Sequence, residues 1–116
     1  MLWDEEFIQK LPNIDRKWEA PFIAHVVTES TVKHKNVKKF ILKWYNKISD
    51  KKKAKYASRL RSIDNKEFIS QIMEFYVAEL CEQYGHVEFD PVLENGQTPD
   101  LLLTINGTQA LIDVVI

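Results

Sequence analysis

This chain contains few of the residues that build disulfide or zinc scaffolds. A single cysteine, Cys81, is present among its 116 residues. One thiol can form neither an internal disulfide nor a cysteine zinc site, so the reducing cytoplasm is the expected location. Any bound metal would need oxygen or histidine ligands. His25, His34 and His86 lack the spacing of metal ligands, and we expect them on the surface or in the core.

Long apolar runs are also missing. None approaches the ~20 residues that a transmembrane helix needs. The N-terminal sequence MLWDEEFIQK is acidic where a signal peptide would be basic and then apolar. We therefore expect a soluble, unexported protein without a membrane partner. Because 45% of the residues are hydrophobic, the chain can form a globular core.

Basic residues are nearly absent from the C-terminal part of the chain. Residues 33–65 contain twelve lysines and arginines against two aspartates, whereas residues 66–116 contain one lysine against nine acids. This asymmetry suggests that the basic part holds a polyanion and the acidic part holds a metal or carries out chemistry. The alternative is an ordinary solvated lysine surface.

Hydrophobic periodicity and capping residues predict four helices. They are expected at residues 3–12, 32–49, 51–62 and 66–85, the last beginning after Asp64 and ending at Gly85. The segment FIAHVV, between the first and second helices, fits either a strand or a helical turn. On the second helix a lysine recurs at every fourth position, opposite an apolar stripe. Together with the start of the third helix, these positions are the candidate nucleic-acid contacts: Lys35, Lys39, Lys43, Lys47, Lys51, Lys52 and Lys53.

The helix over 66–85 is apolar on two sides. Its wider face comprises Phe68, Ile69, Ile72, Tyr76 and Leu80, and its narrower face comprises Ser70, Val77, Ala78 and Cys81. A helix with two apolar faces is expected to be sandwiched, with the wider face on the preceding helices and the narrower face on a sheet. Glu74 would then point toward that sheet. Glu79, on the wider side, is the competing candidate for a functional acid.

Two aspartates flank a predicted β-hairpin. The segment HVEFDP alternates as a strand, and Asn106-Gly107 between apolar runs indicates a two-residue type I′ turn. This turn sets a register in which Asp100 stands directly opposite Asp113. Like charges in that position are destabilising. Either one carboxylate is protonated or a divalent cation lies between the two, and Mg²⁺ suits a pair of carboxylates completed by water and phosphate.

Strand alternation also predicts which hairpin residues are buried. Asp100, Leu102 and Thr104 share one face of the sheet with Gln109, Leu111, Asp113 and Val115. The other face is expected to form continuous apolar core: Leu101, Leu103, Ile105, Ala110, Ile112, Val114 and Ile116.

The order of these features resembles the PD-(D/E)XK nuclease superfamily, which has the restriction-endonuclease-like fold. Residues 58–115 are similar to a group of uncharacterised bacterial proteins in which a Glu-bearing helix leads to Pro-Asp and then to an acid-bearing strand. The resemblance implies that Pro99-Asp100 is the PD motif and Asp113 its second acid. It also implies catalytic roles for Glu74, Asp100 and Asp113, with Asp100 and Asp113 holding Mg²⁺ for phosphodiester hydrolysis of DNA.

Two features depart from that family. The motif lysine, which should follow Asp113 by two residues, is replaced by Val115. The family core continues with a helix and a further strand, so we expect either that this chain is a fragment of a longer protein or that a second chain, as in a homo-oligomer, completes the sheet. The fold class expected is α/β (α+β), with a helical basic region at 1–63 and a partial nuclease-like α-β-β-β core at 64–116.

Three functions are consistent with this sequence. The first is a Mg²⁺-dependent nuclease that is complete only in a longer protein. The second is a catalytically inactive nuclease-like domain that binds nucleic acid or protein, and the third is a structural interaction domain that merely shares the hairpin. The missing lysine favours the second.

Overall fold

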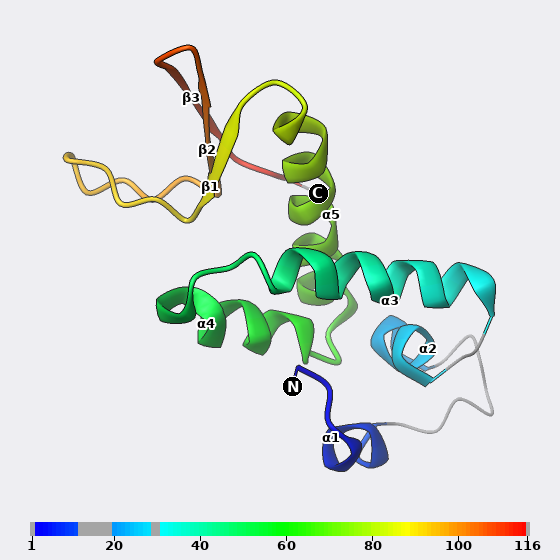
Figure 1. Ribbon diagram of the computed structural model, residues 1–116. Helices are drawn as coiled ribbons and strands as arrows, with labels where there is room; N and C mark the ends of the chain where they lie inside the picture. Colours follow the sequence, from blue (N-terminus) through cyan, green and yellow to red (C-terminus); the bar gives the residue numbers. More distant parts are fainter. Residues whose placement is uncertain (1, 12–19, 29–30, 116) are drawn as a thin grey trace. The chain divides into compact units, whose positions relative to one another are not determined.

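Five helices precede a three-stranded sheet in the part of the chain that the structure, a computed structural model, describes, namely residues 2–11, 20–28 and 31–115. The elements are α1 (Glu5–Gln9), α2 (Phe22–Thr28), α3 (Val32–Tyr45), α4 (Asp50–Leu60), α5 (Asn65–Glu82), β1 (His86–Phe89), β2 (Leu101–Ile105) and β3 (Thr108–Ile112) (Figure 1). This order confirms the predicted α+β class, with helices first and strands last. Within the described ranges, no helix is long and apolar enough to cross a membrane.

The chain divides into two compact units inside α5. We call Met1–Gln71 the helical unit and Ile72–Ile116 the sheet unit. The sequence had placed a boundary at residue 63, ahead of this helix, whereas the structure places it after the second turn of α5. All 16 lysines and arginines belong to the helical unit, and the sheet unit has eight acids with neither lysine nor arginine.

Aspartates cap the starts of two helices, and the cap at Asp64 is the predicted one. The first helix, predicted over residues 3–12, covers only Glu5–Gln9. The Asp4 carboxylate accepts the Phe7 N–H at 2.8 Å before α1, and Asp64 accepts the Lys66 N–H at 2.9 Å before α5. Each bond satisfies one of the N–H groups that a helix start leaves without an intrahelical partner. Ser49 occupies the N-cap position of α4, but its side chain makes no capping hydrogen bond.

The segment FIAHVV, whose structure the sequence left open, is helix α2. Four of its residues are buried: Ile23, Ala24, Val26 and Val27. The first turn is joined to the preceding chain by the Ala24 N–H, which donates to the Pro21 carbonyl at 3.0 Å. Tertiary burial therefore decides the conformation of a short segment whose β-branched residues fit a strand equally well.

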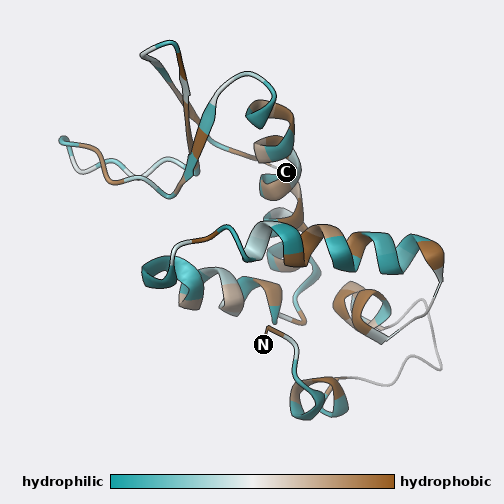
Figure 2. Cartoon of the chain, in the orientation of Figure 1, coloured by the Kyte–Doolittle hydropathy of each residue, from teal (hydrophilic) through white to brown (hydrophobic). Residues whose placement is uncertain are grey.

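The core of the helical unit joins distant parts of the sequence. The buried Trp3 indole N–H donates to the Leu60 carbonyl at 2.9 Å. The rings of Phe22 and Phe68 meet edge to face, with centroids 5.8 Å apart. Trp44 of α3 is fully buried in this core, while the outer positions of α3 and α4 are mostly hydrophilic (Figure 2). The two basic helices are thus anchored by their inner faces.

The buried side of α5 differs from the predicted one. Phe68, Phe75 and Ala78 are fully buried, whereas Tyr76 and Leu80 of the predicted wide face are 50% and 48% exposed. Placing those two residues on a packed face was wrong. Two phenylalanines determine which side of α5 is buried. In the helical unit, Phe68 packs on Phe22. In the sheet unit, Phe75 packs edge to face on Phe89 of β1, with ring centroids 5.6 Å apart.

The hairpin has the predicted register. β2 and β3 are antiparallel, with Ile105 paired with Thr108 and Leu101 with Ile112. Asn106 and Gly107 have φ values of 49° and 83°, the left-handed conformation that a type I′ turn requires. β1 pairs with the other side of β2, so the strand order is β1-β2-β3.

The buried residues of the sheet differ in part from the predicted apolar face. Leu101 and Leu103 are buried as predicted, but Leu102 from the opposite face is equally buried. Ile105 is 38% exposed and Ala110 is exposed, so the predicted continuous core face was wrong there. Ala110 lies on the edge strand β3, and Ile105 lies at the end of β2 beside the Asn106-Gly107 turn, so neither residue is covered as the middle of β2 is.

Candidate carboxylate pair and basic surface

The two aspartates of the hairpin lie side by side, one position beyond the last paired residues of β2 and β3. The Asp100 carboxylate accepts the Val114 N–H at 2.8 Å, and the Asp113 carboxylate accepts the Asp100 N–H at 3.1 Å. Each acid is therefore hydrogen-bonded to the backbone of the opposite chain segment. Asp100 is half-buried and Asp113 is exposed. The proximity predicted from the register is confirmed.

These backbone hydrogen bonds offset part of the repulsion between the two acids. An N–H group aimed at a carboxylate forms a charge-assisted hydrogen bond, which is about twice as strong as a neutral one. The sequence had suggested a shared proton or a bound cation as the compensation. The sequence did not suggest that the N–H groups of Asp100 and Val114 would compensate the two charges. The direction of these groups depends on the path of the chain before β2 and after β3, beyond the regular ladder.

Glu74 lies on α5 and is 5% exposed. Its competitor Glu79 is half-buried, and both make contacts within the protein. Among residues 2–11, 20–28 and 31–115, histidine, cysteine, aspartate and glutamate side chains form no cluster of three or more that could hold a metal ion. Within the described residues Glu74 thus does not join Asp100 and Asp113 in such a cluster, and its catalytic role stays a prediction. Val115, at the position of the motif lysine, is 88% exposed.

A pocket of about 380 Å³ lies beside this pair. It is lined by Gly96, Gln97, Thr98, Pro99, Leu111 and Asp113. One wall is the loop that leads into β2, and the other is the end of β3. Among the described residues that line it, Asp113 is the one that carries a charge.

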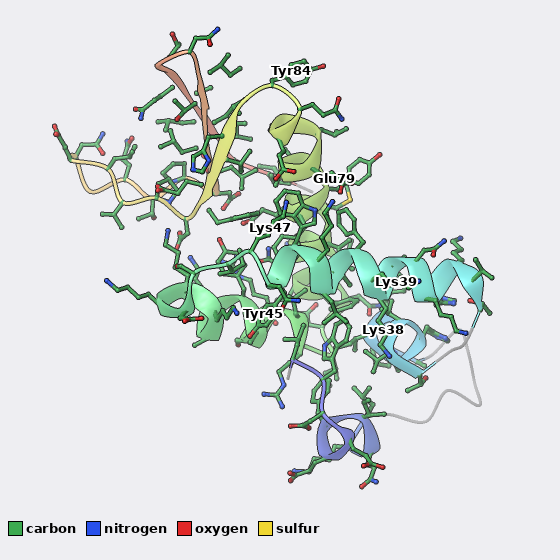
Figure 3. The ribbon with its side chains drawn as sticks, viewed as in Figure 1. Lys38, Lys39, Tyr45, Lys47, Glu79 and Tyr84 are labelled. Carbon is green, nitrogen blue, oxygen red and sulfur yellow. The ribbon has the colours of Figure 1, made fainter. Side chains whose placement is uncertain are left out.

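The predicted nucleic-acid contacts lie on α3, on α4 and in the connection between them. We call these seven residues the basic surface: Lys35, Lys39, Lys43, Lys47, Lys51, Lys52 and Lys53. The first five are exposed and the last two are half-buried. Figure 3 shows Lys39 and Lys47 on this part of the helical unit, with Lys38 next to Lys39. α3 packs against α4, so the lysines of both helices belong to one folded unit.

Aromatic rings hold several of these lysines in place. The Lys47 ammonium lies 4.2 Å from the centre of the Trp44 ring, and that of Lys43 lies 5.5 Å from it. Lys53 lies 5.4 Å from the centre of the Tyr45 ring. Cation–π attraction over these rings reduces the freedom of the lysine side chains. Trp44 and Tyr45 were predicted only as members of the apolar stripe of this helix, although their spacing from the lysines was a usable signal of these contacts.

The start of α4 concentrates positive charge. Lys51, Lys52 and Lys53 occupy its first turn, where the helix dipole is already positive. Asp50 offsets part of this positive charge, because one of its carboxylate oxygens lies 3.7 Å from the Lys53 ammonium. The Lys52 and Lys53 N–H groups both bond the Ser49 carbonyl. A helix start with this charge is electrostatically suited to an anion such as phosphate.

No family model matches this chain, and no curated protein or solved structure is significantly similar to it. The resemblance to PD-(D/E)XK nucleases therefore stays a prediction.

Proposed function

We propose that this protein binds the sugar-phosphate backbone of nucleic acid through the basic surface. The observation that carries the proposal is the presence of seven lysines on two successive, mutually packed helices and the connection between them, five of them exposed. Lysines at the N-terminus of α4 supply point charges beside a positive helix end, a combination that favours phosphate.

The charge distribution supports this surface over the carboxylate pair as the place where a polyanion binds. The sheet unit contains eight acids and neither lysine nor arginine. A phosphodiester that approached Asp100 and Asp113 would meet their negative charge without a nearby cation from the same unit. The proposed activity is therefore binding without cleavage. Lysine contacts to phosphates carry no base information, so binding is expected to be largely independent of sequence.

Salt dependence gives the quantitative test. If the five exposed lysines of the basic surface each neutralise one phosphate, the logarithm of the association constant should fall with the logarithm of salt concentration with a slope of about −4.5 on duplex DNA. Fluorescence anisotropy of a labelled duplex, measured over a range of salt concentrations, gives this slope.

Matched variants identify the surface. Lys35→Gln with Lys39→Gln removes two exposed charges from α3, whereas Lys10→Gln with Lys66→Gln removes two exposed charges elsewhere in the same unit. We expect the first pair to lower the magnitude of the slope by about 2 and the second to leave it nearly unchanged. Equal effects of the two pairs would show that only net charge matters, and would refute a defined surface.

Mg²⁺-dependent phosphodiester hydrolysis is the second candidate, because Asp100 and Asp113 lie side by side. Two adjacent carboxylates are a ligand set that Mg²⁺ uses together with water and phosphate. A cleavage assay with Mg²⁺, repeated on Asp100→Asn and Asp113→Asn, tests it. Cleavage lost in both variants, with DNA affinity retained, would establish an active site separate from the basic surface. A cytoplasmic location is part of both proposals, since a lone thiol suits a reducing compartment.

A further inference from the structure

β3 is an edge strand without the usual protection. Among the described residues it pairs only with β2. Its sequence, TQALI, contains no charged residue and no proline, the features that normally keep an edge from pairing with other chains. Four of its five residues are exposed, and Leu111 is 52% exposed. In an antiparallel ladder the backbone groups of an edge strand that point away from its partner remain available for a further strand.

A pocket is lined in part by the end of the same strand. Leu111 and Asp113, two residues apart on one face, line it together with the loop residues Gln97 and Thr98. Its volume of about 380 Å³ is large enough for a long side chain. The hydroxyl of Thr98 and the carboxylate of Asp113 can both accept hydrogen bonds from a cationic head. Leu111 provides an apolar wall for the methylene groups of that side chain.

The negative charge of the sheet unit favours a cationic ligand. Eight acids with neither lysine nor arginine attract a cationic partner and repel an acidic one. The same charge disfavours a second sheet unit as the occupant of the edge.

From the edge, the pocket and this charge, we propose that β3 binds an extended basic peptide segment as an additional strand, and that the pocket at Asp113 receives one of its lysine or arginine side chains. Main-chain hydrogen bonds then supply affinity and the pocket supplies specificity, as in other cases of strand addition. This site is separate from the basic surface and does not depend on the proposed nucleic-acid binding.

Three capped peptides serve as probes. In the first, lysine alternates with valine; in the second, glutamate alternates with valine; in the third, lysine alternates with proline and cannot form a regular ladder. Binding is followed by amide chemical shifts of the isotope-labelled full chain. We expect only the lysine–valine peptide to bind, with shift changes at residues 108–113 and 96–98. Equal binding of the lysine–proline peptide, or shift changes elsewhere, would overturn the proposal.

A first pair of variants tests whether a cationic side chain of the peptide enters the pocket. Asp113→Asn keeps an oxygen that can accept the Asp100 N–H but removes the charge, and Glu94→Gln removes one charge from an exposed loop residue outside the pocket lining. We expect Asp113→Asn to weaken peptide binding about fivefold, the loss of one partly exposed ion pair. Glu94→Gln should have a much smaller effect. Equal losses in the two variants would indicate general attraction and refute the pocket.

Thr98→Lys is a second variant that does not alter the hairpin. It places an ammonium group in the pocket, whereas Val92→Lys adds the same charge at an exposed position outside the lining. We expect Thr98→Lys to weaken binding at least as much as Asp113→Asn, and Val92→Lys to weaken it less. Sedimentation of the free chain completes the test, since dimerisation through β3 would make a second copy the occupant and overturn the proposal.

Discussion

Replacing Asp100 separates a structural from a metal-binding role for the carboxylate pair. Asp100→Ala removes the acceptor of the Val114 N–H, a bond of 2.8 Å in a partly buried position. A hydrogen bond to a charged group contributes about 1.5–3 kcal/mol when well buried. Asp100 is only half-buried, and removing it also relieves repulsion from Asp113, which costs up to about 1 kcal/mol. We therefore expect a net loss of about 1 kcal/mol in the free energy of unfolding.

Asp100→Asn is the informative comparison. The amide oxygen can still accept the Val114 N–H, while the like charge opposite Asp113 is gone. The free energy of unfolding should stay within about 0.5 kcal/mol of the parent value or rise slightly. Glu94→Ala, which removes an exposed carboxylate from the same unit, controls for net charge. Denaturant titrations followed by circular dichroism measure all three variants.

Added Mg²⁺ distinguishes the two roles. If Asp100 and Asp113 hold the ion, Mg²⁺ at about a hundred times its dissociation constant should raise the free energy of unfolding by about 2.7 kcal/mol, and Asp100→Asn should abolish that gain. The structural interpretation expects no such gain. The structural interpretation would be refuted if Asp100→Asn destabilised the protein as much as Asp100→Ala, since the negative charge of Asp100 would then be required for stability.

Three further changes test the fold. Gly85→Ala would place a Cβ against the Thr104 carbonyl oxygen, closer than van der Waals contact allows, so β1 must shift away from β2. We expect a loss of about 2 kcal/mol or more in the free energy of unfolding, and an unchanged value would show that the backbones are farther apart. Trp3→Phe leaves the buried Leu60 carbonyl without the indole donor and should cost about 1–3 kcal/mol by denaturant titration. Gly107→Ala imposes a side chain at φ 83° and should cost about 1–2 kcal/mol, whereas a neutral result would exclude the type I′ turn.

Local sequence signals were sufficient for most of the secondary structure. The Asn106-Gly107 turn specified the hairpin and its register, because a two-residue turn leaves only one way to pair the strands. Asp64 marked the start of α5 by offering a carboxylate to an otherwise unpaired N–H. The segment at Phe22–Thr28 could not be assigned, since it is too short for its hydrophobic periodicity to distinguish a helix from a strand.

The sequence by itself determined where the charges lie and that Asp100 must stand beside Asp113, since both follow from residue order and from one tight turn. Only the tertiary structure decided which side of α5 is buried, because that depends on Phe22 and Phe89 reaching it from other elements. It also decided how the two acids are accommodated. The backbone N–H groups that bond them are directed by the path of the chain beyond the strands, and no local pattern of side chains encodes that path.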